Sequence, residues 1–205
     1  MRVAVFGGTG ATGRHIVEQA LAAGHTLTVL ARDPARLLSA KHDRLTVVQG
    51  SALSRDHVVR TVAGADAVLS ALGGASLRDE HTVYTAAALI VEAMQAGGAR
   101  RIVLVGSAGI FGEVPGLPGL VVKTLLRHPL RDHRRQYEVL CTSGLDWILV
   151  RAVRLGDGPR TGVYRVAREG FPRRGSLIAR ADVADFMIRS LTDDSYLRSA
   201  PAIAY

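Results

Sequence analysis

Three glycines near the start of the sequence, Gly7, Gly10 and Gly13, have the spacing of a phosphate-binding turn. Apolar residues 2–6 precede them, and residues 12–23 have the periodicity of an amphipathic helix. In such a turn the first glycine permits the tight bend, the second lets a pyrophosphate approach the backbone, and the third allows close packing of helix and strand. Free N–H groups at the start of the helix then face the phosphates. The pattern predicts a dinucleotide site; a purely structural glycine turn is the alternative.

The residues after the second apolar segment bear on which dinucleotide would bind. Arg32 stands where NAD sites have an acidic residue for the ribose 2′-hydroxyl, and Arg36 follows one helical turn later. We interpret Asp33 as the N-cap of a helix that Pro34 opens. Two arginines here favour NADPH, whose 2′-phosphate they would bind. The alternative is that they are ordinary surface arginines in an arginine-rich chain.

Other strand ends supply further candidates. Gly73 and Gly74 offer little side chain where ribose and pyrophosphate would pass, and Ser107 places a hydroxyl near the expected nicotinamide, or is an ordinary turn residue. Ser51 follows the third strand in place of the Asp that often reads adenine, which weakens adenine recognition. The full set of expected cofactor contacts is Gly7, Thr9, Gly10, Ala11, Thr12, Gly13, Arg32, Arg36, Ser51, Ala52, Leu72, Gly73, Gly74 and Ser107.

Strand and helix patterns alternate along the whole chain. Strands are predicted near 2–6, 26–31, 45–48, 67–71, 101–106 and 146–151, and helices near 12–23, 34–40, 54–63, 79–97, 131–143 and 181–191. This alternation predicts an α/β protein of the Rossmann type: one domain over residues 1–205, with a doubly wound parallel sheet as the middle of three layers. The glycine- and proline-rich stretch 106–118 would form a loop over the ligand.

The net charge of +8 raises the question of nucleic-acid binding. Aromatic residues make up only 5% of the chain, and the arginines are scattered through every segment, so we expect no nucleic-acid partner. One dense cluster is flanked by His128 and His133, and it is either a solvated helix face or a positive rim for an anionic ligand. It comprises Arg127, Arg131, Arg134 and Arg135.

No segment reaches the roughly 18 consecutive apolar residues of a membrane span. Only residues 3–6 are apolar before the first glycine, too few for a signal peptide, so we expect a cytoplasmic protein, either a monomer or a weak homodimer. Cys141 is the single cysteine, which excludes a disulfide within the chain and a cysteine-based zinc cluster. We expect it to be packed in its helix, and we expect no metal site.

At this level the chain resembles the atypical short-chain dehydrogenases/reductases, and within them the biliverdin IXβ (flavin) reductases of the NmrA-like group. The segments that carry the resemblance are 7–13, 29–33, 61–68, 143–145, 156–157, 161–162 and 181–187. The resemblance implies NADPH as hydride donor, with Ser107 beside the reacting centre and a broad site for flat conjugated substrates. Arg154 is a departure, because it stands where that family has a histidine.

The Tyr–Lys pair of the usual short-chain enzymes is missing. Tyr137 is the only tempting match, and position 141 is a cysteine, so we interpret Tyr137 as a packing residue or a substrate contact. The expected function is hydride transfer from NADPH to a flavin, linear tetrapyrrole or quinone, where solvent can supply the proton. Ser107 would orient the acceptor, and Arg154 and His133 would attract its acidic groups. The alternatives are a non-catalytic NADP(H) sensor of NmrA type and an enzyme with another carbonyl or quinone substrate.

Overall fold

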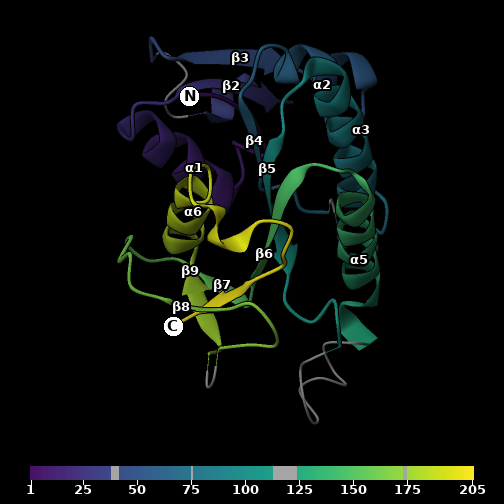
Figure 1. Ribbon diagram of the computed structural model, residues 1–205, viewed down its shortest axis with the longest axis vertical. Helices are drawn as coiled ribbons and strands as arrows, with labels where there is room; N and C mark the ends of the chain where they lie inside the picture. The colour runs from purple at the N-terminus through teal and green to yellow at the C-terminus, as the bar shows by residue number, and fades with distance from the viewer. Residues whose placement is uncertain (38–41, 75, 113–123, 173–174) are drawn as a thin grey trace.

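The computed structural model describes residues 1–205 except 38–41, 75, 113–123 and 173–174, and it has a central eight-stranded sheet (Figure 1). The strands, in their order across the sheet, are β3 (Leu45–Gln49), β2 (Thr26–Ala31), β1 (Arg2–Phe6), β4 (Ala67–Ser70), β5 (Arg101–Ser107), β6 (Asp146–Ala152), β10 (Ala202–Ala204) and β8 (Arg165–Ala167). The first six follow the classic dinucleotide-binding order, in which the chain reverses direction across the sheet between β1 and β4.

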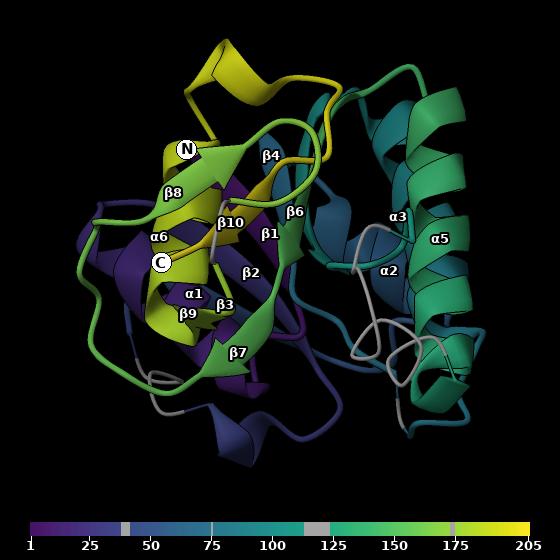
Figure 2. The ribbon, with the colours of Figure 1, turned by 90° about the horizontal axis from the view of Figure 1, so that it is seen from below.

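Helices cover both faces of the sheet and make it the middle of three layers, as predicted (Figure 2). One face carries α1 (Ala11–Ala22) and α6 (Arg180–Arg189), which pack against each other. The other carries α2 (Arg55–Val62), α3 (Thr82–Gly97) and α5 (Arg127–Thr142). Two short 3₁₀ helices, η1 (Pro34–Arg36) and η2 (Asp194–Tyr196), lie outside these layers.

The central strands are buried on both faces of the sheet. Their sequences are therefore continuous apolar runs and do not alternate between apolar and polar residues. In β1, Val3 and Val5 face the core under α1 and α6, whereas Ala4 and Phe6 face the core under α2, α3 and α5. All four residues are at most 1% exposed. The strand residues are therefore occupied in the core, and the residues just after the strands can contact a ligand.

Several details differ from the expected elements. The sheet is not wholly parallel, because β8 pairs antiparallel to β10. A separate two-stranded sheet joins β7 (Arg154–Gly156) and β9 (Leu177–Ala179). The helix expected near 34–40 is described only as η1, since Leu37 is already extended and residues 38–41 lie outside the described part. Most of the predicted 106–118 loop, from residue 113 on, also lies outside it.

Candidate cofactor-binding site

A cavity of about 510 Å³ opens beyond the carboxyl ends of β1, β2, β3 and β4, where ligands bind in open α/β sheets. It falls within the usual size of small-molecule sites, roughly 300–1,000 Å³. Its lining includes most of the expected cofactor contacts, namely Gly7, Thr9, Gly10, Ala11, Thr12, Arg32, Arg36, Ser51, Ala52, Leu72, Gly73 and Gly74. The sequence therefore predicted which residues meet at this edge of the sheet; their contact with a cofactor stays a prediction.

The glycine turn has the backbone shape that the sequence required. Gly7 has a φ of +78°, a conformation that residues with side chains rarely adopt. A Cβ there would also lie 2.7 Å from the carbonyl carbon of Ala71, so there is no room for a side chain. At Gly13 a Cβ would be 1.9 Å from the carbonyl oxygen of Gly7, which confirms the close approach of helix and strand. At Gly10 only the Gly7 oxygen lies near, at 3.2 Å. Gly10 thus faces the cavity and leaves its backbone open to a ligand.

The start of α1 supplies donors and no competing anion. Gly10 is the N-cap and makes no side-chain cap, and the first turn contains no acidic residue. The N–H groups of Ala11, Thr12 and Gly13 belong to this turn, where a helix has no internal acceptors for them. Together with the positive end of the helix dipole, these N–H groups suit an anion near Ala11 and Thr12, which line the cavity.

Arg32 and Arg36 are exposed and line the same cavity. In the described part of the chain neither side chain makes an ion pair or a hydrogen bond, and no Asp or Glu is among the lining residues. Asp33 is occupied as predicted, because its Oδ1 accepts the N–H of Ala35 at 3.1 Å and caps η1. The cavity therefore carries two uncompensated positive charges, which suits a phosphate group.

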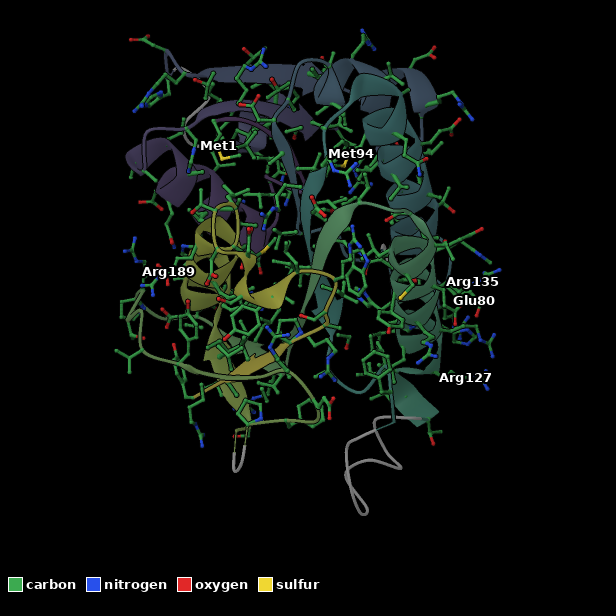
Figure 3. The ribbon with its side chains drawn as sticks, in the orientation of Figure 1. Met1, Glu80, Met94, Arg127, Arg135 and Arg189 are labelled. Atoms are coloured by element: carbon green, nitrogen blue, oxygen red, sulfur yellow. The ribbon has the colours of Figure 1, made fainter. Side chains whose placement is uncertain are left out.

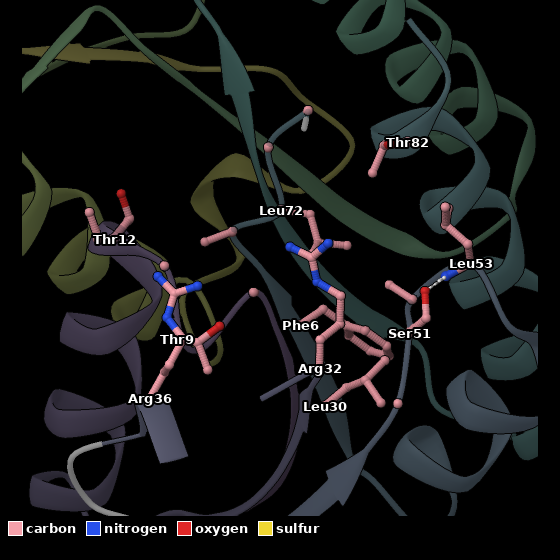
Figure 4. A pocket seen from close by; sticks show the side chains of 18 residues that line it. Phe6, Thr9, Thr12, Leu30, Arg32, Arg36, Ser51, Leu53, Leu72 and Thr82 are labelled. Carbon is pink, nitrogen blue, oxygen red and sulfur yellow. Dashed lines mark hydrogen bonds between the residues drawn. The ribbon is translucent and has the colours of Figure 1, made fainter. Parts of the chain in front are cut away.

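The two guanidinium groups extend into the cavity separately (Figure 4). Arg36 lies on the side of Thr12, and Arg32 reaches toward Leu72, nearer Ser51. In their present directions the two side chains do not point at one place, and their joint contact with a 2′-phosphate stays a prediction. Both side chains are long and exposed.

Some lining residues were not expected from the sequence. Phe6 ends β1, Leu30 is the residue before the last of β2, and Gly50 and Leu53 flank the predicted Ser51 and Ala52. Ala71 also lines the cavity, next to the segment 72–74 with which the sequence had grouped it. Including a few more residues on either side of each predicted strand end would have identified them. Thr82, the first residue of α3, also lines the cavity, and no local signal marks it, because only the packing of α3 brings it there.

Ser107, His133 and Arg154 do not line the cavity and make no hydrogen bonds with one another in the described structure. Ser107 ends β5, and its hydroxyl donates to the carbonyl oxygen of Ala108 at 3.1 Å. Arg154 is exposed on β7. Nδ1 of His133 lies 3.0 Å from Oε1 of Gln136, and burial lowers the pKa of the imidazole, although Gln136 opposes that effect. A neutral His133 would attract anions weakly.

Tyr137 packs against other aromatic rings, as the first of its two interpretations predicted, and its contact with a substrate stays a prediction. Its ring makes edge-to-face contacts with Phe111, at 4.9 Å between centroids, and with Trp147, at 5.7 Å. Hydrogen bonding with Cys141, followed by burial, raises the pKa of the phenol, which is the opposite of what a proton-donating Tyr–Lys pair requires. Cys141 itself is exposed, so the prediction that it is packed in its helix was wrong. It lies on the outer side of α5, in the helix's last turn.

The arginine cluster on α5 largely has local partners. Glu80 accepts from Arg131 at 2.9 Å and pairs with His128 at 2.9 Å, and these contacts lower the pKa of Glu80, His128 first. Arg134 pairs with Glu138, and Arg135 stacks over Tyr84. Figure 3 places Arg127, Arg135 and Glu80 on the outer side of α5, away from the sheet. Of the two readings, these contacts favour the solvated helix face.

Two features are absent from the residues that the structure describes. No helix there is both long enough and apolar enough to cross a membrane. No group of three or more His, Cys, Asp or Glu residues there is placed to hold a metal ion.

Known proteins similar to this chain include reductases and an assembly factor. The photosystem II assembly factor Ycf39 of Synechocystis is 27% identical over 202 residues, which are 97% of this chain and 60% of that protein. Pinoresinol reductase 2 of Arabidopsis thaliana is 35% identical over 108 residues, covering 49% of this chain and 34% of that protein. The chain thus spans 60% or less of the length of these curated relatives.

Solved structures with the same fold match almost the whole length of this chain, and the match covers almost the whole length of theirs. A short-chain dehydrogenase/reductase from Veillonella parvula in complex with NADP has a TM-score of 0.83 at 20% identity, covering 100% of this chain and 94% of that one. ChuY, an anaerobilin reductase from Escherichia coli O157:H7, has a TM-score of 0.83 at 21% identity, covering 100% and 97%. A family model for NAD(P)H-binding proteins matches residues 7–194, and the chain therefore belongs to this NAD(P)H-binding Rossmann family.

Proposed function

We propose that this protein is an NADPH-dependent reductase that passes a hydride to a planar conjugated acceptor: a flavin, a linear tetrapyrrole or a quinone. The observation that carries the proposal is the pairing of an open glycine turn with two unpartnered arginines in one cavity that has no acidic lining residue. Each charge-assisted bond to a 2′-phosphate would contribute about 1.5–3 kcal/mol. Such a cavity would favour NADPH over NADH.

In this proposal each wall of the cavity holds one part of the cofactor. The start of α1 and Gly10 would bind the pyrophosphate, and Arg32 and Arg36 the 2′-phosphate. Ser51 and Ala52 would contact the adenine. The ribose would pass along the segment 72–74, and the nicotinamide would extend beyond the cavity lining toward Ser107 at the end of β5. The bound cofactor would supply the hydride, and the chain's own residues would fix its orientation.

The state of Tyr137 supports this choice of acceptor class. Tyr137 is packed and its pKa is raised, so this phenol is not prepared to protonate a carbonyl oxygen. An electron-poor conjugated ring tolerates this lack, because solvent can protonate it after hydride addition. Ser107 would orient the acceptor, and the exposed Arg154 would draw acidic groups toward the site. The names of the similar proteins, pinoresinol and anaerobilin reductases, support a reductase. We place it in the cytoplasm as a monomer or weak homodimer.

A non-catalytic NADP(H) sensor of NmrA type is the second candidate. The state of Tyr137 favours it, because the raised pKa of this phenol does not make it a prepared proton donor. An assembly factor among the similar proteins also fits a role without turnover. Both candidates predict tight binding of NADPH, so cofactor affinity alone does not separate them.

Turnover with a panel of acceptors separates the two. NADPH is mixed with the protein and FMN, riboflavin, a biliverdin or a quinone, and loss of NADPH absorbance is followed. A reductase consumes NADPH at a rate that reaches a maximum as the concentration of one of these acceptors is raised. Ser107→Ala should lower kcat only moderately, well short of the roughly 10²–10⁴-fold loss of a general acid. Tight NADPH binding without turnover on any acceptor would reject the reductase in favour of the sensor.

A further inference from the structure

His57, in the first turn of α2, holds the loop that follows β3 in place. The main-chain N–H of Ser51 donates to Nδ1 of His57 across 3.2 Å. The imidazole also lies against Gly50, where a Cβ atom would be 2.5 Å from Cγ of the ring. Gly50 and Ser51 line the cavity, whereas His57 does not. The ring therefore supports the loop from behind, and the missing side chain at Gly50 makes room for it.

Three further hydrogen bonds complete the shape of the loop. Gly50 donates its N–H to the carbonyl oxygen of Ala31 at 3.0 Å, Leu53 donates to Oγ of Ser51 at 3.2 Å, and Ser54 donates to the carbonyl oxygen of Ser51 at 3.1 Å. The bond to His57 is the one that ties the loop to a side chain of α2. Nδ1 is the acceptor in that bond, which requires the imidazole tautomer with its proton on Nε2.

We propose that His57 is a positioning residue for the adenine end of the cofactor. The inference rests on the proposed function, since it places NADPH in the cavity with its adenine against residues 50–53. No acidic side chain in this loop can bond the adenine amino group, so the loop contributes through its shape, its main chain and the small apolar side chain of Ala52. A loop that is fixed before binding loses less entropy when the ligand arrives. Removal of His57 would also leave the Ser51 N–H without its partner.

The test uses adenosine 2′,5′-bisphosphate, a probe with the adenine, ribose and 2′-phosphate of NADPH and no nicotinamide. Calorimetry gives its Kd for the wild type, His57→Asn and His57→Leu. Asparagine can place its Oδ1 near the position of Nδ1 and accept the Ser51 N–H, whereas leucine fills similar space without an acceptor. We expect His57→Asn to bind within about twofold of the wild type, and His57→Leu about three- to tenfold more weakly.

Thermal melting of the three proteins shows that each is folded, and rescue by asparagine separates positioning from a general loss of structure. Equal affinities in wild type and His57→Leu, or equal losses in both variants, would overturn the role of His57. Failure of the wild type to bind the probe would overturn the proposed cofactor site itself, and the inference with it.

A double-variant cycle tests the contact between Gly50 and the ring. Gly50→Ala alone would drive a methyl group into the imidazole and should weaken probe binding about as much as His57→Leu does. In a His57→Ala background the space is open, so adding Gly50→Ala should cost little more. Fully additive losses would show that ring and glycine act independently, against the proposed arrangement.

Discussion

Arg32 and Arg36 differ from many other arginines of the chain in what surrounds them. Arg131 and Arg134 bond carboxylates on the α3–α5 side of the molecule, and Arg101 bonds Asp194 and two carbonyl groups near the end of α6. The two cavity arginines have no such partners in the described structure. Their position just after β2 was readable in the sequence, but their lack of partners was not. That lack depends on which residues the fold brings near.

Replacing either cavity arginine with alanine should change the preference between the two dinucleotides. Arg32→Ala or Arg36→Ala removes a cation that would bond the 2′-phosphate, so NADPH affinity should fall about ten- to hundredfold while NADH affinity changes little. Calorimetric titration of both nucleotides measures the ratio. Arg60→Ala is a matched control, because Arg60 is exposed on α2 outside the cavity. Equal losses for NADPH and NADH would argue against a 2′-phosphate contact.

At the scale of elements, the six longer strands could be located from apolar runs, and each lies within about two residues of its predicted position. The four later strands were missed. Each has only three residues, and each depends on a partner distant in sequence, as β7 does on β9. Such pairings leave no periodic signal. For the same reason Thr82 was not predicted in the site, because only the packing of α3 brings it there. The role of the arginine cluster on α5 could not be decided from the sequence either, because its partner Glu80 lies on another segment.

The turn between β1 and α1 allows two glycines to be compared within one element. Gly10→Val should leave the fold intact, because the residue has a φ of −78°, but it should abolish measurable NADPH binding by filling the cavity wall. Gly13→Ala should instead destabilise the fold, since its methyl group would meet the Gly7 oxygen, which is fixed backbone. Urea unfolding and NADPH titration of both variants separate the effects. A folded Gly10→Val protein that still binds NADPH would show that the turn is structural only.

At the scale of the whole molecule, Asp182 joins segments that are far apart in the chain. Its carboxylate is fully buried at the start of α6 and accepts from the N–H groups of Thr161 and Gly162 at 2.8 Å, from the Thr161 hydroxyl at 2.8 Å, and from the Tyr205 hydroxyl at 2.6 Å. Burial acts to raise the pKa of this carboxyl group, but the four donors outweigh it and hold the pKa below its ordinary value. The C-terminal third is thereby tied to α6 and, through it, to α1.

Asp182→Asn should therefore lower the free energy of unfolding by about 1–3 kcal/mol, because an amide cannot accept all four bonds. Tyr205→Phe removes one donor and should cost less, about 1 kcal/mol. The folded carboxyl group has the lower pKa, so its contribution is complete well above the unfolded pKa of about 3.9 and is lost as the pH falls through the folded value. In urea unfolding, the difference between wild type and Asp182→Asn should then be constant near neutral pH and narrow below about pH 4. A difference that stays constant or grows in acid would mean that the Asp182 charge does not stabilise the fold.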